Sequence, residues 1–382
     1  MRPAPARRPR PAPSAAQPEG PDRPPSRRRR RRSVRLRAAT AAPLSGALAC
    51  LLAAAAPTAP AQAAGHARAT GADGGSQALR AAAGRKFPMR ITAYVANTAS
   101  GTTSVSNTRP ERMTGAVPVG AAPTGVGAAQ DGNAVYVANS GSNTVSILDP
   151  VTRAVVANVG VGSLPFAAVP SYDGRRVLAA NFGSDTVSVI DPGKRKVVGT
   201  VPVGPLPHSI ATVPSGRAYV TNNGGNTVSV VDPGTGRVTG TIPVGDFPSG
   251  ITASRRGGRI YVANTGSGTV SVISAAAGRV TRTIPAGQAP LGVALSPDGT
   301  RMYVADSGTN SLLVIDPVTR ALLSTITVGI NPQGVAVTPD GRRVWVTNEG
   351  SDTVSVIDPG KGKVHTTLPT GREPEGIAIT PR

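Results

Sequence analysis

A segment of about 42 residues recurs seven times in this chain, and this repetition constrains the fold more than any other feature. Typical copies read AVYVANSGSNTVSILDP and RVWVTNEGSDTVSVIDP. One polar position recurs every 41 or 42 residues, at Asn97, Asn139, Asn181, Asn222, Asn264, Asp306 and Asn348. A period of this length is typical of architectures in which each unit buries its apolar face against its neighbours.

Each repeat contains four strand signals, which the last complete copy shows as GVAVTPDG, RRVWVTN, TVSVIDP and KVHTTLPTG. Apolar and polar residues alternate in them, and Val, Ile and Thr are abundant, as half-buried strands require. Pro-Asp-Gly and Asp-Pro-Gly segments supply the turns between them. No segment has a sustained helical period. Four short antiparallel strands per unit predict an all-β, seven-bladed β-propeller.

The two ends of the repeat array predict how the ring closes. The first copy begins at its second strand signal, around Met89–Asn97. The chain ends on Glu375–Pro381, a first strand signal with no copy after it. We therefore expect the C-terminal strand to complete the N-terminal blade, which would leave seven full blades and no open sheet edge.

Short motifs within the repeats carry a family resemblance. Tyr94–Asn97 reads YVAN and Tyr219–Asn222 reads YVTN, and TVSVIDP and PVG-x-x-P segments follow them. These motifs resemble the YVTN-repeat β-propeller family over residues 89–382, although Leu178–Asn181 and Ser274–Ala275 depart from the pattern. The resemblance implies similarity to exported and surface-layer bacterial propellers and a quinoprotein-like superfamily. It implies a fold more firmly than an activity, because one fold hosts many functions.

Residues 1–63 have the organisation of a secretory signal peptide. A long Arg- and Pro-rich n-region contains the run Arg27–Arg32, Ala38–Ala56 is apolar, and Ala61–Ala63 forms an A-x-A site with cleavage predicted after Ala63. A retained membrane anchor is the alternative, but the apolar stretch is short and rich in alanine. We expect residues 64–88 to be a flexible linker and the mature protein to be secreted or associated with the cell envelope.

The formal net charge of +21 is unevenly distributed along the chain. Residues 1–64 hold 13 Arg against two acidic residues, so about half of the charge lies in the leader. The remaining basic surface suits anionic envelope polymers or serves solubility. The sequence shows no continuous basic stripe and few aromatic residues for base stacking, which argues against nucleic acid. We expect a monomer without a membrane span, whose partner is an unidentified protein or envelope polymer.

Residues shared by all repeats serve the fold, so positions that break the pattern are the functional candidates. One shared position carries an aromatic core residue in six repeats, at Tyr94, Tyr136, Tyr219, Tyr261, Tyr303 and Trp345. The variable positions lie in the V-G-x-x-P-x-G loop, which in a propeller reaches the mouth of the central channel. Seven polar residues there form the candidate ligand-binding site: His208, Asp246, Asn331, Gln333, Arg372, Glu373 and Glu375. They suit a small polar ligand, and a merely solvated rim is the alternative.

The inventory of reactive side chains argues against a catalytic constellation. The chain has three histidines, His66, His208 and His365, and its only cysteine, Cys50, lies in the leader. It also lacks a G-x-S-x-G elbow and a phosphate-binding loop. We therefore predict no catalytic site, no metal and no cofactor.

Two hypotheses for function follow from this inventory. The first is an exported binding or scaffold protein of the cell envelope or secretome. The alternative is a lactonase-like hydrolase or lyase at the channel mouth, in which Glu373, Glu375, Asp246 and Asn331 hold a divalent ion. A cluster of carboxyl groups with strongly shifted pKa values would favour the alternative.

Overall fold

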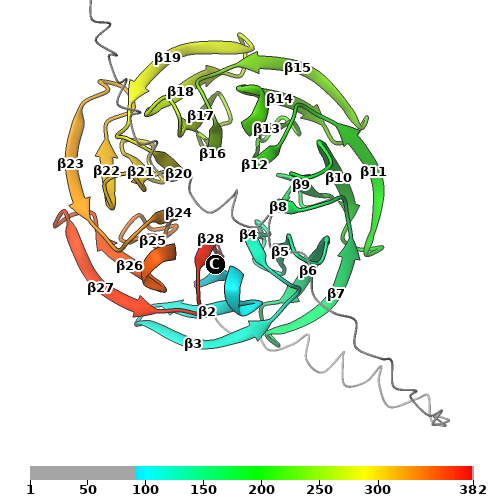
Figure 1. The fold of residues 1–382 in the computed structure, drawn as a ribbon, viewed down its shortest axis with the longest axis horizontal. Coiled ribbons are helices and arrows are strands. Elements are labelled where there is room, and N and C mark those ends of the chain that lie inside the picture. Colours follow the sequence, from blue (N-terminus) through cyan, green and yellow to red (C-terminus); the bar gives the residue numbers. More distant parts are fainter. Residues whose placement is uncertain (1–90, 381–382) are drawn as a thin grey trace, which may run out of the picture. The chain divides into compact units, whose positions relative to one another are not determined.

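The computed structural model describes residues 91–380 and contains seven four-stranded antiparallel sheets arranged around one axis (Figure 1). The predicted signal peptide and linker lie outside the described residues. In the described part, helical structure is limited to the 3-10 turns η2 (Thr98–Ser100), η3 (Asn223–Gly225) and η4 (Glu349–Ser351). No helix there is long and apolar enough to cross a membrane. The predicted all-β, seven-bladed propeller is confirmed.

Each blade begins with an inner strand beside the ring axis, followed by a second strand paired to it. From blade 1 to blade 7, the inner strands are β28 (Pro374–Ile379), β4 (Pro123–Ala128), β8 (Pro165–Pro170), β12 (Pro207–Thr212), β16 (Pro248–Ala253), β20 (Pro290–Leu295) and β24 (Pro332–Val337). The second strands are β1 (Thr92–Asn97), β5 (Val135–Asn139), β9 (Val177–Asn181), β13 (Ala218–Asn222), β17 (Arg259–Asn264), β21 (Met302–Asp306) and β25 (Val344–Asn348).

A third strand and an outer strand complete each blade. In the same order, the third strands are β2 (Thr102–Thr108), β6 (Thr144–Asp149), β10 (Thr186–Asp191), β14 (Thr227–Asp232), β18 (Thr269–Ser274), β22 (Ser311–Ile315) and β26 (Thr353–Asp358). The outer strands are β3 (Glu111–Pro118), β7 (Ala154–Gly160), β11 (Lys196–Pro202), β15 (Arg237–Pro243), β19 (Arg279–Pro285), β23 (Leu322–Thr327) and β27 (Lys363–Pro369).

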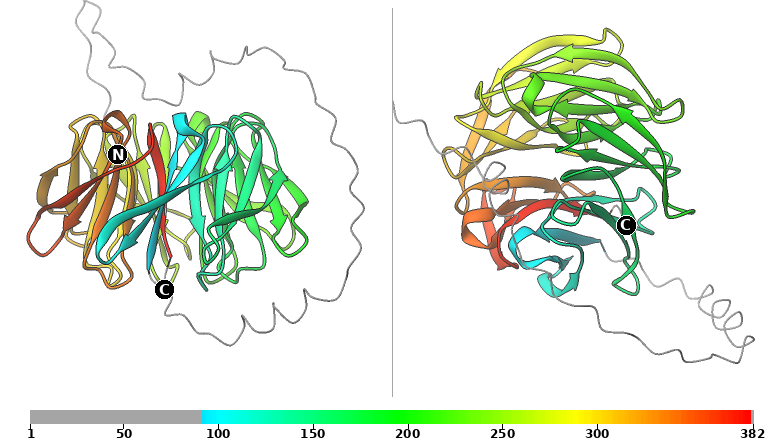
Figure 2. Two further views of the ribbon diagram at one scale, coloured as in Figure 1. Left: turned by 90° about the horizontal axis from the view of Figure 1, so that it is seen from below. Right: turned by 45° about the vertical axis from the view of Figure 1, so that its right-hand side comes forward.

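The ring closes where the C-terminal strand joins the N-terminal blade, as predicted. Strand β28 pairs antiparallel with β1, with Tyr94 opposite Ala378 and Val95 opposite Ile377 (Figure 2). The backbone N–H of Thr92 also donates to the Thr380 hydroxyl at 2.9 Å. This pairing gives blade 1 the same four strands as the other blades, so no inner edge is left unpaired.

The apolar core lies between neighbouring blades. Val228 of blade 4, for example, packs with Ile260 and Val262 of blade 5 in one buried cluster. The shared aromatic position is buried in all six repeats, and Trp345 is 0% exposed. Burying one such side chain contributes about 1.5–3 kcal/mol relative to exposure, so the repeated alternation of apolar residues is what specifies the ring.

The recurring asparagine joins the second and third strands of a blade. In blade 4, Asn222 Nδ2 donates to the hydroxyls of Thr227 and Ser229, each at 2.9 Å. The same pair of bonds recurs in the other blades that carry asparagine. The recurring asparagine therefore serves the fold, as predicted for residues shared by the repeats, and its partners lie on the third strand. A Cβ atom at Gly204 would lie 2.6 Å from Asn222 Cγ, so the loop glycine lets the chain pass close to this side chain.

Candidate functional site

Two variable positions of every blade meet at one end of the inner strands. The proline that starts an inner strand pairs with the recurring asparagine, as Pro332 does with Asn348. The residue after that proline and the residue after that asparagine therefore lie at the same end of the blade. The first position holds Thr124, Phe166, His208, Ser249, Leu291, Gln333 and Glu375, and the second holds Thr98, Ser140, Phe182, Asn223, Thr265, Ser307 and Glu349.

Glu349 is the functional candidate that the sequence analysis missed. It occupies the position after the asparagine, where five of the other blades carry Thr, Ser or Asn and blade 3 carries Phe182. Glu349 is therefore the single acidic residue at this position. The signal in the sequence is a break in the repeat pattern, since an acidic residue stands in a turn where the other blades carry Thr, Ser, Asn or Phe.

Glu349 brings the predicted residues of blade 7 together. Asn331 Nδ2 donates to Glu349 Oε2 at 2.8 Å, and Gln333 Nε2 donates to the same oxygen at 2.5 Å. Glu349 opens η4, Gln333 lies on β24, and Asn331 lies in the loop before β24 at a positive φ of 52°. Two amide donors on one oxygen fix the orientation of the carboxyl group.

Glu375 and Glu373 of blade 1 complete this group of residues. The Thr347 hydroxyl of blade 7 donates to the Glu375 carbonyl at 2.6 Å, which ties β25 to β28. Glu373 is exposed and has a φ of 54°. We call Asn331, Gln333, Glu349, Glu373 and Glu375 the carboxyl cluster. Figure 1 shows that its strands β24 and β28 are neighbours in the ring.

Burial and mutual repulsion shift the acidity of the carboxyl cluster. Desolvation, reinforced by the charge of Glu349 and opposed by a hydrogen bond from the Thr98 hydroxyl, raises the pKa of Glu375 to about 8. Desolvation and the charge of Glu373 also raise the pKa of Glu349, against a hydrogen bond from Gln333. Glu375 is therefore largely a neutral acid at pH 7. A neutral carboxylic acid beside a second carboxyl group is an arrangement typical of acid–base chemistry.

Arg372 was predicted to belong to this group, but its side chain has other partners. Its guanidinium donates to the Ala99 carbonyl at 3.1 Å, and its backbone N–H donates to the Ser100 hydroxyl at 2.8 Å. Within residues 91–380 it forms no ion pair with the glutamates of the carboxyl cluster. Arg372 thus fastens the loop to η2 and does not neutralise the cluster.

His208 lies in an aromatic cluster on blades 3 and 4. The ring centroid of Phe166 is 4.7 Å from that of Phe182 and 5.2 Å from that of His208. Desolvation lowers the pKa of His208 to about 4, although a hydrogen bond to the Ser249 backbone opposes the shift. The imidazole is therefore neutral at physiological pH, and its buried Nδ1 has no partner among the described residues.

Asp246 and His208 were both predicted to belong to the ligand-binding site, but the structure gives the two side chains separate partners. The Asp246 carboxylate accepts hydrogen bonds from Asn226 Nδ2 at 3.0 Å and from the Ser267 hydroxyl at 3.2 Å. These bonds hold the loop before β16. Asp246 belongs to blade 5, and Glu375 belongs to blade 1.

The divalent-ion arrangement considered for the alternative hypothesis is not assembled. Asp246 is remote in the ring from Glu373 and Glu375, as their blades show. Within residues 91–380, no group of three or more His, Cys, Asp or Glu side chains is arranged to hold a metal ion. The residues present therefore do not fit the predicted ion site, and we derive no chemistry through a metal.

One family model matches the part of the ring that contains the carboxyl cluster. Residues 261–378 match the family model for the SMP-30/gluconolactonase/LRE-like region. This segment is about a third of the chain and includes all five members of the carboxyl cluster. The chain matches no curated protein. The finer resemblance to YVTN-repeat propellers stays a prediction.

Solved structures with the same architecture include three at low sequence identity. Hydrazine synthase of Kuenenia stuttgartiensis is 22% identical, with a TM-score of 0.64 over 72% of this chain and 96% of that chain. A putative 6-phosphogluconolactonase of Bacteroides fragilis is 17% identical, with a TM-score of 0.66 over 77% and 99%. A protein of unknown function from Desulfotomaculum acetoxidans is 16% identical, with a TM-score of 0.68 over 76% and 98%. These similarities show the fold alone.

Proposed function

We propose that this protein binds a small lactone-like ester at the carboxyl cluster and hydrolyses it. The observation that carries the proposal is the neutral Glu375 beside Glu349, since one group can donate a proton while the other accepts one. The family match over residues 261–378 supports it, because that segment holds the whole cluster. The fold shared with a putative lactonase is compatible with this chemistry.

The two glutamates have different roles in the proposed reaction. The Glu349 carboxylate accepts a proton from water as the water oxygen attacks the ester carbonyl. The carbon–oxygen bond of the ring then breaks, and protonated Glu375 donates its proton to the departing oxygen. Water thereby supplies the new carboxyl oxygen, and transfer of one proton from Glu349 to Glu375 restores the starting state.

The hydrogen bonds of Glu349 suit its role as the base. In residues 91–380, both amide donors contact Oε2, so Oε1 is the oxygen that would contact the attacking water. The donors also hold the carboxyl group in one orientation, which reduces the entropy cost of reaction. Asn331 and Gln333 are positioning residues in this scheme.

The test is hydrolysis of five- and six-membered lactones by the purified protein in water enriched in ¹⁸O. We expect a hydroxy acid with one ¹⁸O in its carboxyl group, and loss of turnover in Glu349→Gln. Asp246→Asn is the control, since Asp246 lies in the proline loop before β16 and its carboxylate is not used in the mechanism. Equal turnover in wild type, Glu349→Gln and a protein-free blank would reject the proposal.

Binding without turnover is the second candidate function. It is favoured by the internally satisfied hydrogen bonds of the carboxyl cluster and by the lack of a metal-holding group in residues 91–380. The protein would then act as a binding or scaffold propeller for an unidentified protein or envelope polymer. Calorimetry that detects binding of an isolated envelope polymer, by protein that incorporates no ¹⁸O label into lactones, would select this candidate.

We also propose that the propeller acts outside the cytoplasm, either secreted or held at the cell envelope. The signal-peptide pattern of residues 1–63 supports this location, as does the resemblance to exported YVTN-repeat propellers. Expressed in a secreting bacterium, the protein should appear outside the cytoplasm with Ala64 as its first residue, measured by intact mass. Ala63→Phe should block this cleavage, because the site requires a small residue. Full-length protein confined to the cytoplasm would contradict the proposal.

A further inference from the structure

Blade 5 lacks the aspartate that five other blades carry at the end of the third strand, a position that is Asn107 in blade 1. In several blades an arginine at the start of the second strand faces the aspartate that ends the third strand. Arg176 lies 3.3 Å from Asp191, and Arg343 lies 3.5 Å from Asp358. In blade 5 the residue opposite Arg259 is Ser274, so this arginine has lost its acidic partner.

The outer strand of blade 5 adds a second cation at the same place. The residue paired with the central valine of the third strand is Arg282, opposite Val272. The other blades have small residues there: Gly115, Ala157, Gly199, Gly240, Ser324 and Thr366. Compared with blades 3 and 7, blade 5 therefore has one fewer negative charge and one more positive charge at this place.

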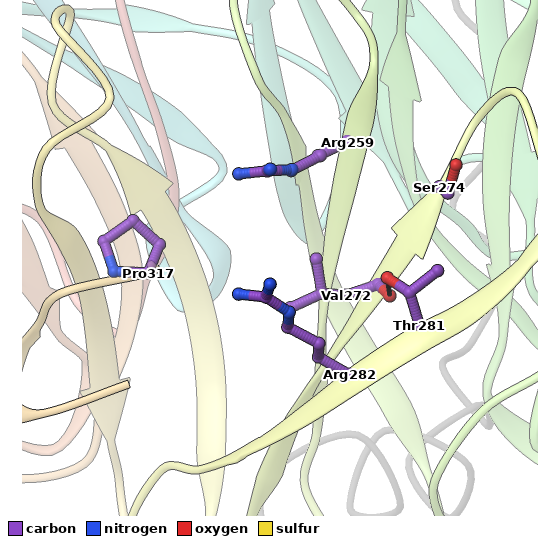
Figure 3. A pocket seen from close by; sticks show the side chains of 6 residues that line it. All are labelled: Arg259, Val272, Ser274, Thr281, Arg282 and Pro317. Carbon is purple, nitrogen blue, oxygen red and sulfur yellow. Dashed lines mark hydrogen bonds between the residues drawn. The ribbon is translucent and has the colours of Figure 1, made fainter. Parts of the chain in front are cut away.

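These two changes line one cavity between blades 5 and 6. Its volume is about 250 Å³, and its walls are Arg259, Val272, Ser274, Thr281, Arg282 and Pro317. Figure 3 shows both guanidinium groups extending toward Pro317, which belongs to the next blade. We call this cavity the blade 5 groove.

The arginines of the blade 5 groove are available to a ligand. Arg282 Nη1 donates to the Val318 carbonyl at 3.2 Å, which holds the side chain across the gap between the blades. Neither Arg259 nor Arg282 forms an ion pair within residues 91–380. The neighbouring acid, Asp316, already accepts the backbone N–H groups of Val318 and Thr319 in its own turn.

We propose that the blade 5 groove binds the phosphoryl or sulfo group of a small molecule. Two guanidinium groups present forked donors that match tetrahedral oxyanions. The Ser274 hydroxyl, which accepts from the Ala277 N–H, adds one donor, whereas the Thr281 hydroxyl already donates to the Val272 carbonyl at 3.1 Å. A water molecule takes about 30 Å³ of liquid, so the cavity holds an oxyanion and part of its carrier. The groove lies at the end of the blade where β17 begins, and the carboxyl cluster lies at the end where such strands finish. The two sites are therefore independent.

The test is binding of inorganic phosphate and of glycerol 3-phosphate to the purified protein, at constant ionic strength set with sodium chloride. Calorimetry should detect one site per chain, and the melting temperature should rise with ligand concentration. Arg282→Gly and Ser274→Asp should each weaken binding at least about tenfold, since each removes or neutralises a charge-assisted hydrogen bond. Tighter binding of glycerol 3-phosphate than of inorganic phosphate indicates that the organic part of the ligand also occupies the groove. Equal binding of the two indicates a site for the free anion.

Two features of the design keep the result decisive. Ser274→Asp introduces the residue that five other blades carry at this position, so the variant should fold. Arg195→Gly is the matched control, because Arg195 is an exposed arginine at a positive φ whose Nη1 also donates to a carbonyl of the neighbouring blade, that of Val156. Binding that is absent in wild type, or weakened as much by Arg195→Gly as by Arg282→Gly, would overturn the proposal.

Discussion

Glu375→Gln is expected to lower the rate of lactone hydrolysis about 10²- to 10⁴-fold, the usual contribution of a general acid. Glutamine keeps the size of the side chain but cannot donate the proton that the departing oxygen requires. In wild type the rate should fall as pH rises through about 8, where Glu375 loses its proton. The measurement is the pH dependence of kcat/KM, and the variant should lack this alkaline decline.

The same substitution should also change how stability depends on pH. The pKa of Glu375 is about 8 in the folded protein against an ordinary value of 4.5. The stability linked to this group is therefore fully present below pH 4.5 and is lost as pH rises toward 8. The glutamine side chain does not ionise, so Glu375→Gln does not lose this stability as pH rises. At pH 8 the free energy of unfolding of the variant should therefore exceed that of wild type by about 3 kcal/mol, allowing for partial solvent screening.

Urea denaturation at pH 5 and pH 8 measures this second effect. Asp246→Asn is the control, because Asp246 is exposed and lies on blade 5, so its removal leaves the surroundings of Glu375 and the charges that act on it intact. We expect the control to retain the pH dependence of wild type. Identical pH dependence in wild type and Glu375→Gln would show that Glu375 is ionised in the fold, and the acid role proposed for it would be lost.

The fold could be predicted from sequence because its determinants are local and repeated. The alternation in strands such as Thr353–Asp358 is visible within six residues, and seven copies at one spacing make the ring unambiguous. Even the closure followed from counting strand signals at the two ends. Packing between blades was then a consequence of the repeat.

The candidate site was less accessible because its chemistry arises between blades. Gln333 and Glu375 were identified from the proline loop, but Glu349 was not, since it contacts them only when the turn after β25 meets β24 and β28. His208 looked like a rim residue, and its burial beside Phe166 became visible only in three dimensions. Sequence shows which residues break a repeat, whereas burial decides their pKa.

Gly376→Ala is expected to destabilise the propeller by about 2–4 kcal/mol, because the added Cβ atom would clash with the neighbouring inner strand β4 at the point where the ring closes. A Cβ at this position would lie 2.4 Å from the Thr124 carbonyl oxygen, 2.9 Å from Gly125 Cα and 3.0 Å from Val126 N. All three are backbone atoms of β4, so no side-chain rotation relieves the clash. Inserting a group into such a packed contact forces backbone shifts that cost energy of this order.

The position of Gly376 makes the consequence larger than a local clash. Strand β28 is the segment that closes the ring, and displacing it would uncover the edge of β1, which then becomes available for pairing with other chains. Gly199→Ala is the matched control, since its Cβ would meet Val189 Cβ at 3.9 Å, an ordinary contact. We expect the control to stay within about 0.5 kcal/mol of wild type, and Gly376→Ala to unfold at lower urea concentration and to aggregate. Equal urea midpoints for the two variants would mean that blades 1 and 2 can separate without loss of stability, and that the inner strands do not hold the ring closed.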